Sequence, residues 1–98
     1  LSGGNAQKIV IAKWLNTDPA LIILNGPTNG VDVGAKFDIH KILHNLAAQG
    51  IGVILISDDL SELIQNCNTI LIMKDRRMAS MIQTAEVNET RLAEMLSS

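Results

Sequence analysis

Residues 20–27 read ALIILNGP, and this stretch decides the fold class of the 98-residue chain. A continuous apolar run, residues 20–24, ends directly in the turn-forming triplet Asn-Gly-Pro. A short apolar run bounded by turn residues predicts a strand that is buried on both faces, as in parallel sheets. Residues 52–56 (GVILI) repeat the pattern, and residues 69–73 (TILIM) predict a third strand.

Helical patterns precede and separate these strands. Ser2 is a good N-cap for a helix-compatible run that ends near Leu15. Asp32 can cap a second helix, and Gly50 is its natural stop. The apolar positions of this second helix recur at helical spacing, which predicts a buried stripe: Val33, Phe37, Ile42, Leu43 and Leu46.

The last part of the chain predicts a short helix, a hairpin and a final helix. Ser57 is expected to cap the short helix, and Asn88 the last one. A tight turn at residues 74–77 leads into a fourth strand, although such turns usually carry Gly where Arg76 or Arg77 stands. Strands that alternate with helices predict an α/β fold with a mostly parallel sheet.

Composition excludes several classes of function. With 47% hydrophobic residues and only Trp14 and Phe37 aromatic, the core must be aliphatic. A net charge of −2 predicts no attraction to nucleic acid or to an anionic membrane. The single Cys67 suits a reducing compartment, and no apolar run approaches the roughly 20 residues that span a bilayer. We expect a cytoplasmic chain, excised from a longer protein or processed at Leu1.

Two motifs offer a phosphate or a metal site. Ser2, Gly3 and Gly4 precede a helix, where backbone N–H groups can hold an anion, although the same triplet also makes an ordinary capped turn. Asn25 ends a strand at the place where nucleotide-hydrolysing P-loop proteins carry an acid for Mg²⁺. An ordinary strand-to-turn exit explains Asn25 equally well.

Other polar clusters favour structural roles. Capping is the default role of Asp32, and Asp58 with Asp59 at a helix start more often pairs with the helix dipole than with a metal. His40 and His44 are four residues apart, but no third ligand accompanies them. The sequence therefore predicts no metal site.

The order of these motifs resembles the ATP-binding-cassette (ABC) transporter ATPases. Residues 1–8 (LSGGNAQK) with 12–15 (AKWL) are similar to the signature motif in the second ATPase half of monosaccharide importers. Residues 21–36 resemble the Walker B strand and D-loop, and residues 54–60 the switch region. The resemblance implies that residues 1–98 are a C-terminal fragment of one nucleotide-binding domain, ending in a hairpin and helix, with a partial P-loop NTPase fold.

The resemblance also implies roles for single residues. Ser2, Gly3, Gly4 and Gln7 would contact the γ-phosphate of ATP bound by the opposite half, and Asp32 would belong to the D-loop that touches that site. ATP and Mg²⁺ would be cofactors of the parent. Its partners would be a second ATPase half and transmembrane permease subunits at the inner face of the cell membrane, where ATP hydrolysis energises sugar transport.

Three departures from the family pattern imply that the chain's own site is degenerate. Asn25 replaces the Walker B Asp and loses its charge. Gly26 replaces the Glu that positions the attacking water, and a positioned general base is worth about 10²- to 10⁴-fold in rate. Asp58 stands at the switch position, which is His in most of the superfamily, and would repel developing negative charge.

The sequence contains no G-x-x-x-x-G-K-[ST] phosphate loop, so the chain alone is expected to be inactive and without cofactor. In the family fold, the strand that enters this loop lies between residues 52–56 and 69–73. Its absence predicts two unpaired strand edges, which would close directly on each other or associate with a second copy. Two other interpretations remain: a non-catalytic interaction module, and a receiver-like or flavodoxin-like module, for which further acids or a Lys at other strand ends are missing.

Overall fold

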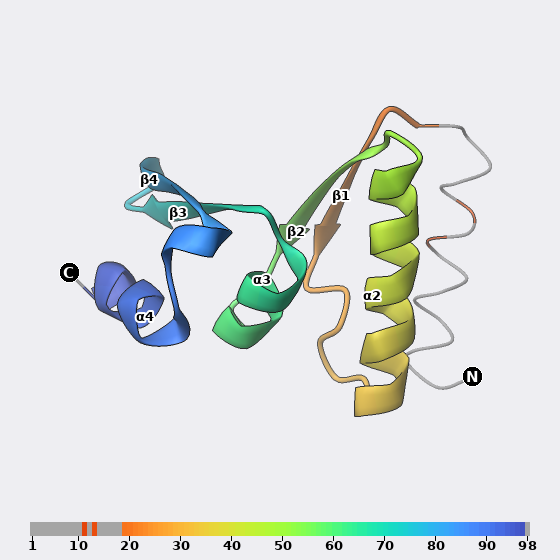
Figure 1. Ribbon diagram of the computed structural model, residues 1–98, viewed down its shortest axis with the longest axis horizontal. Helices are drawn as coiled ribbons and strands as arrows, with labels where there is room; N and C mark the ends of the chain where they lie inside the picture. Colours follow the sequence, from red (N-terminus) through yellow and green to blue (C-terminus); the bar gives the residue numbers. More distant parts are fainter. Residues whose placement is uncertain (1–10, 12, 14–18, 98) are drawn as a thin grey trace. The chain divides into compact units, whose positions relative to one another are not determined.

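The computed structural model describes residues 11, 13 and 19–97, and these fall into two compact units that divide between Ile56 and Ser57 (Figure 1). The first unit contains β1 (Leu21–Asn25), α2 (Val33–Ala48) and β2 (Gly52–Ile56). The second contains α3 (Leu60–Asn66), β3 (Thr69–Lys74), β4 (Arg77–Gln83), the 3₁₀ turn η1 (Thr84–Glu86) and α4 (Glu89–Ser97). This confirms the α/β class. No described helix is both long and apolar enough to cross a membrane.

In the first unit, β1 and β2 form a parallel pair that packs on α2. The register runs from Leu21 opposite Gly52 to Asn25 opposite Ile56. Parallel strands need a crossover connection, and α2 supplies it. The core is aliphatic, as expected, and combines residues from before the sheet, from β1 and from α2: Ile11, Ile22, Ile39, Leu43 and Leu46.

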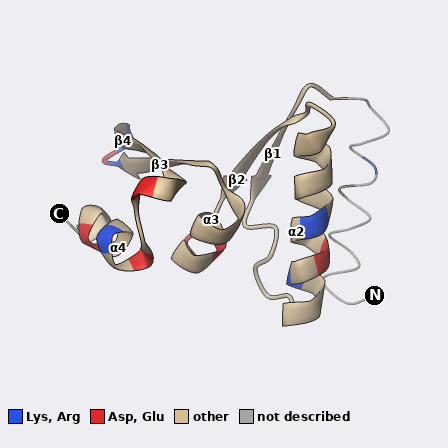
Figure 2. Ribbon diagram, viewed as in Figure 1, with Lys and Arg blue, Asp and Glu red and all other residues tan. Residues whose placement is uncertain are grey.

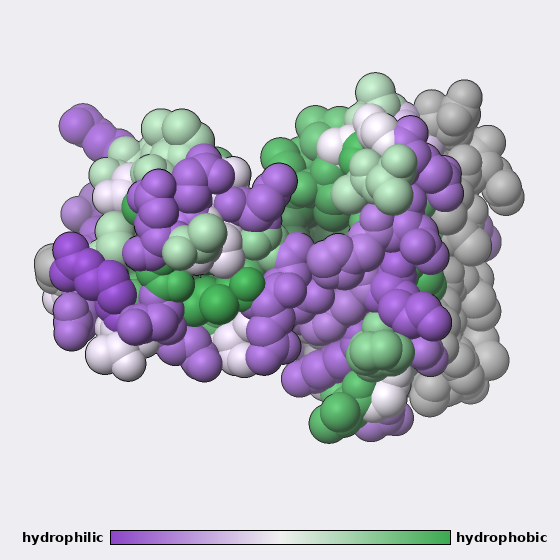
Figure 3. Space-filling view, viewed as in Figure 1, coloured by the Kyte–Doolittle hydropathy of each residue, from purple (hydrophilic) through white to green (hydrophobic). Residues whose placement is uncertain are grey.

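The second face of this parallel pair is exposed, so the prediction of strands buried on both faces is wrong within this chain. Ile23 is 59% exposed and Ile54 is 43% exposed. Neither strand carries a charge (Figure 2), and apolar surface appears next to β1 and β2 (Figure 3). One face of the parallel pair is therefore as apolar as a protein core, but none of the described residues covers it.

The buried stripe of α2 also differs from its predicted one. Leu43 and Leu46 are buried as predicted, but Val33 is 83% and Phe37 64% exposed, and fully buried Ile39 takes their place. The ends of the helix agree with prediction: Asp32 is the N-cap, and Gly50 follows the helix with a φ of +90°. Spacing alone could not decide which side of the first two turns faces the sheet, because apolar residues occur on both sides.

The second unit is an antiparallel hairpin, β3 with β4, packed on α3 and α4. Its core consists of Ile70, Ile72 and Leu92. The predicted tight turn is present, and its left-handed residues are Asp75 and Arg76, with φ of +50° and +65°. The chain thus makes this turn without the glycine that such geometry favours.

Side-chain caps begin both helices of the second unit. Asn88 Oδ1 accepts a 2.8 Å hydrogen bond from the N–H of Arg91, which confirms the predicted cap of α4. The predicted Ser57 cap of α3 is wrong, because Asp59 is the N-cap. Ser57 Oγ instead accepts a 3.0 Å bond from the N–H of Asp59, so it supports the cap from outside the helix.

The two sheets remain separate in the described residues. β2 pairs with β1, and β3 pairs with β4, with no ladder between β2 and β3. Direct closure of the gap between residues 52–56 and 69–73 joins the two units and stays a prediction. Association of these edges with a second copy stays a prediction.

Candidate functional site

The candidate site lies where β1 ends and the chain turns toward α2. Asn25 is the last residue of β1, is exposed, and pairs in register with Ile56 of β2. The N–H of Gly26 donates a 2.8 Å hydrogen bond to the carbonyl oxygen of Ile56. The carboxyl ends of parallel strands are where α/β proteins place ligands, so this edge is the expected position for a site.

Residues 26–29 form a tight turn directly after β1. The N–H of Asn29 donates a 3.1 Å bond to the carbonyl oxygen of Gly26, with Pro27 and Thr28 buried between them. Gly26 has a φ of +60°, in the left-handed region. Pro is favoured at the second position of such a turn because its fixed φ matches it.

Asp32 follows this turn and begins α2. Its Oδ1 accepts a 2.8 Å hydrogen bond from the N–H of Ala35. The structure therefore brings three predicted residues, Asn25, Gly26 and Asp32, into one continuous segment of the first unit. Capping, the default role, accounts for Asp32 within this chain.

The other predicted site residues are placed differently. Asp58 is exposed at the start of the second unit, next to the N-cap of α3. Ser2, Gly3, Gly4 and Gln7 lie outside the described residues. Their roles stay predictions.

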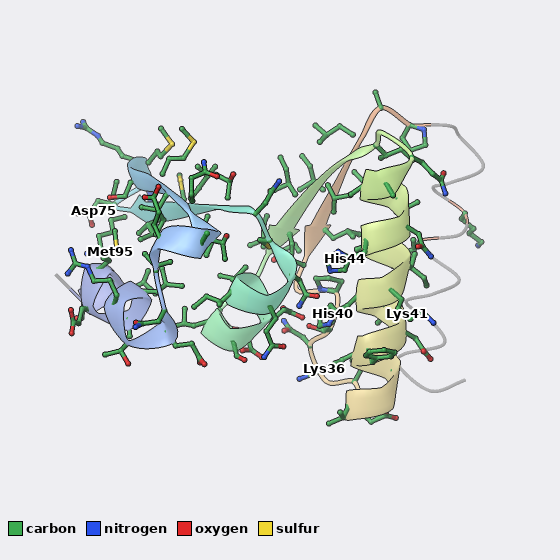
Figure 4. The ribbon with its side chains drawn as sticks, viewed as in Figure 1. Lys36, His40, Lys41, His44, Asp75 and Met95 are labelled. Carbon is green, nitrogen blue, oxygen red and sulfur yellow. The ribbon has the colours of Figure 1, made fainter. Side chains whose placement is uncertain are left out.

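The histidines of α2 form no metal centre with the residues that the structure describes. Lys36, His40 and His44 project from one side of α2, and Lys41 from another (Figure 4). No group of three or more His, Cys, Asp or Glu side chains within the described ranges could hold a metal ion. A zinc site needs at least three protein ligands, so two imidazoles at this spacing are insufficient.

Two features escaped the sequence reasoning. Asn29 lies against Gly26, and the Gly-Pro-x-Asn composition of a tight turn was the signal that could have found it. In the second unit, Glu62 is 5% exposed on α3, close to Cys67. Burial, and then the Glu62 carboxylate, raise the pKa of the Cys67 thiol. A thiol whose pKa is raised forms less of the nucleophilic thiolate than an ordinary thiol does.

Solved structures share this fold. The chain aligns along its whole length with a nucleotide-free ATP-binding cassette from an ABC transporter, at a TM-score of 0.82 and 26% identity, and covers 37% of that chain. It aligns over 99% of its length with cbiO1 of Clostridium perfringens, part of the transporter complex cbiONQ, at a TM-score of 0.80 and 28% identity, covering 38% of that chain. The chain therefore has the fold of part of an ATP-binding cassette.

Sequence relatives place the chain more narrowly. It is 45% identical over 92 residues to the xylose import ATP-binding protein XylG of Geobacillus kaustophilus, covering 94% of this chain and 18% of that protein. It is 41% identical over 97 residues to the galactose/methyl galactoside import ATP-binding protein MglA of Sodalis glossinidius. This match covers 99% of this chain and 19% of that protein. No protein-family model matches. The chain is thus similar to one segment of sugar-import ATP-binding proteins and spans about a fifth of their length.

Proposed function

We propose that this chain is the segment from the signature motif to the C-terminus of one nucleotide-binding domain in an ATP-binding subunit of a sugar importer. The observation that carries the proposal is the match to sugar-import proteins along almost the entire chain. The position of Asn25, Gly26 and Asp32 at the carboxyl end of β1 supports it, because ligands bind at this edge of parallel sheets.

In this proposal, the chain contributes to a nucleotide site that it does not complete. Ser2, Gly3, Gly4 and Gln7 contact the γ-phosphate of ATP held by a partner half, and Asp32 reaches the same site from the D-loop. ATP and Mg²⁺ are cofactors of the longer protein. Its partners are a second ATPase half and membrane permease subunits, and it works at the cytoplasmic face of the membrane.

The chain's own catalytic position is degenerate in this proposal. The Asn25 amide is neutral and holds a Mg²⁺ hydration shell more weakly than a carboxylate does. Gly26 has no side chain to accept a proton from water, and Asp58 adds negative charge at the switch position. The resulting subunit is asymmetric, with hydrolysis at one site and only binding or gating at the other.

An interaction module without any hydrolysis is the second candidate. The exposed aliphatic residues on the uncovered face of β1 and β2 favour it, since such a face is stabilised by a covering partner: Leu21, Ile23, Ile54 and Ile56. The two candidates differ in whether residues 1–8 affect ATP hydrolysis by a partner half.

Substitution in the signature motif of a longer polypeptide that carries this segment tests the proposal. We expect Gly4→Asp to reduce hydrolysis at the partner half's site by at least about tenfold, because a carboxylate there repels the γ-phosphate. Ala48→Asp, on the exposed end of α2, is the matched control and should leave the rate unchanged. Equal rates for the two variants would refute signature donation and leave the interaction module.

A further inference from the structure

We infer that the outer face of the β3–β4 hairpin is a site of reversible methionine oxidation. Hydrogen peroxide is the oxidant, and Met73, Met78 and Met81 are the residues that it modifies. The fourth methionine of the chain, Met95, reacts more slowly because it packs against the core of the second unit. The inference concerns this unit alone and does not depend on the proposed function.

The two faces of the hairpin differ sharply in burial. Along β3, Ile70 and Ile72 are 4% and 3% exposed, whereas Leu71 and Met73 are 51% and 59% exposed. Successive side chains of a strand point to opposite faces, so the buried pair defines the inner face, which packs on residues of α3 and α4. Leu71 and Met73 belong to the outer face. Figure 4 shows sulfur atoms on the side of the hairpin that faces away from α3 and α4.

An irregularity in β4 adds Met78 to the outer face. Met73 lies opposite Met78 and Ile72 opposite Ser80, so β4 has one residue more than β3 between these two pairs. Such a β-bulge changes the face to which the following side chains point. Without it, Met78 would share the inner face with Ser80. With it, Met78 lies on the outer face opposite Met73 and is 58% exposed.

Met81 completes the outer face. It lies opposite Leu71 and is 63% exposed. Residues directly opposite each other in a ladder are side-chain neighbours, so the outer face is a continuous apolar surface made of two cross-strand pairs. Three of the four methionines of the chain lie on this one surface.

The chemistry of this surface is a two-electron oxidation. The thioether sulfur attacks hydrogen peroxide, one oxygen atom is transferred to sulfur, and the other leaves as water. The thioether becomes a sulfoxide, and the peroxide is reduced. In the reverse reaction, a methionine sulfoxide reductase supplies two electrons from thiols, which end as a disulfide, and the oxygen leaves as water. A sulfoxide is polar, so the reaction converts an apolar face into a polar one.

Peptide mass mapping after timed exposure to hydrogen peroxide tests the site. Each oxidation rate in the folded chain is divided by the rate of the same residue in the urea-unfolded chain, which removes differences due to neighbouring residues. We expect the three outer methionines to keep at least about a third of their unfolded rates, and Met95 to be at least about threefold more protected than any of them. Equal protection of all four overturns the inference. Protection of Met78 to the level of Met95 also overturns it, because Met78 would then lie on the inner face.

Two neighbouring substitutions give a matched comparison of the faces. Leu71→Met and Ile72→Met each add one methionine, and the exchange of Leu or Ile for Met changes the side-chain volume little. The methionine introduced at position 71 should react like Met73, and the one at position 72 at most as fast as Met95. Equal rates at the two positions overturn the assignment of the faces. Met95 in the same sample shows whether the core has stayed closed, and the natural chain decides where it has not.

Hydrophobic-interaction chromatography measures the change of the face. Peroxide should make the chain elute earlier, and treatment with methionine sulfoxide reductases and dithiothreitol should restore the original elution. The triple variant Met73→Leu/Met78→Leu/Met81→Leu is the matched control, because it keeps the face apolar and retains the other oxidisable side chains of the chain. Its elution should not change. An equal shift in this control, or a shift that the reductases do not reverse, overturns the inference.

The same peptide map in a longer polypeptide that carries this segment decides whether the site exists there. Faster oxidation of the three outer methionines than of Met95 supports it. If all three are as protected as Met95, further chain covers the face, and the site is overturned for that protein.

Discussion

The carboxylate of Asp32 accepts a 2.8 Å hydrogen bond from the N–H of Ala35, and this contact begins α2 directly after the candidate site. The first N–H groups of a helix have no partner within the helix, so the cap stabilises the element that covers the parallel strands. The same residue is the proposed D-loop contact. Asp32 therefore has two roles, the cap of α2 and the proposed D-loop contact, and substitutions can separate them.

Asp32→Ala should destabilise the chain by about 1 kcal/mol, because it removes the cap, whereas the stability of Asp32→Asn should stay within a few tenths of a kcal/mol of that of the unsubstituted chain. Urea unfolding of the three chains measures this. In a longer polypeptide, a loss of hydrolysis with Asp32→Asn would then report the charge and not the fold. Equal destabilisation by both variants would show that the cap hydrogen bond is unimportant.

Ile39 and Phe37 test which side of α2 faces the core. Ile39→Ala should cost about 2–5 kcal/mol of stability, because Ile39 is fully buried. Phe37→Ala should cost at most about 1 kcal/mol, mainly the contact of its ring with the Lys41 ammonium, 5.9 Å from the ring centre. Thermal unfolding compares the two variants. A larger loss of stability for Phe37→Ala than for Ile39→Ala would support the buried stripe predicted from the sequence.

Arg76→Gly should stabilise the hairpin by about 1 kcal/mol, since glycine removes the strain of a left-handed L-residue with a φ of +65°. Arg77→Gly is the matched control: Arg77 begins β4, where glycine should destabilise by roughly 0.5–1 kcal/mol. Urea unfolding distinguishes the two. If both variants changed the free energy of unfolding in the same direction, the turn geometry would be contradicted.

Cys67 should make stability fall at alkaline pH. Its folded-state pKa is raised, first by burial and then by the Glu62 carboxylate, so its contribution is complete below the pKa of the unfolded thiol. As pH rises from that value through the folded pKa, the unfolded thiol ionises first and stability declines. Unfolding measured across this range should show the decline in the natural chain and lose this component in Cys67→Ala.

Alkylation of the thiol provides an independent check. The pH midpoint for reaction of folded Cys67 should lie above that of the urea-unfolded chain, because only the thiolate reacts. Glu62→Gln should lower the midpoint but leave it above the unfolded one, since burial remains. A folded midpoint at or below the unfolded one would contradict the burial of this thiol.

The sequence alone determined the strands, the ends of α2, the cap of α4 and the resemblance to ATP-binding cassettes. Residues 21–24 and 52–56 are apolar runs between turn residues, and this local contrast was enough to place β1 and β2. Asp32 and Asn88 were predicted as caps because capping depends on a residue and its next three N–H groups. These properties lie within a few residues of chain, where tertiary packing does not intervene.

Only the tertiary structure decided which faces are buried and how the turn at the candidate site is built. Phe37 and Ile39 lie on different sides of α2, and which of the two side chains is buried depends on how the helix packs on the sheet. The turn at Gly26 is held by a hydrogen bond from its N–H to the carbonyl oxygen of Ile56, thirty residues away along the chain. Such contacts join segments that are distant in sequence, so a local pattern carries no record of them.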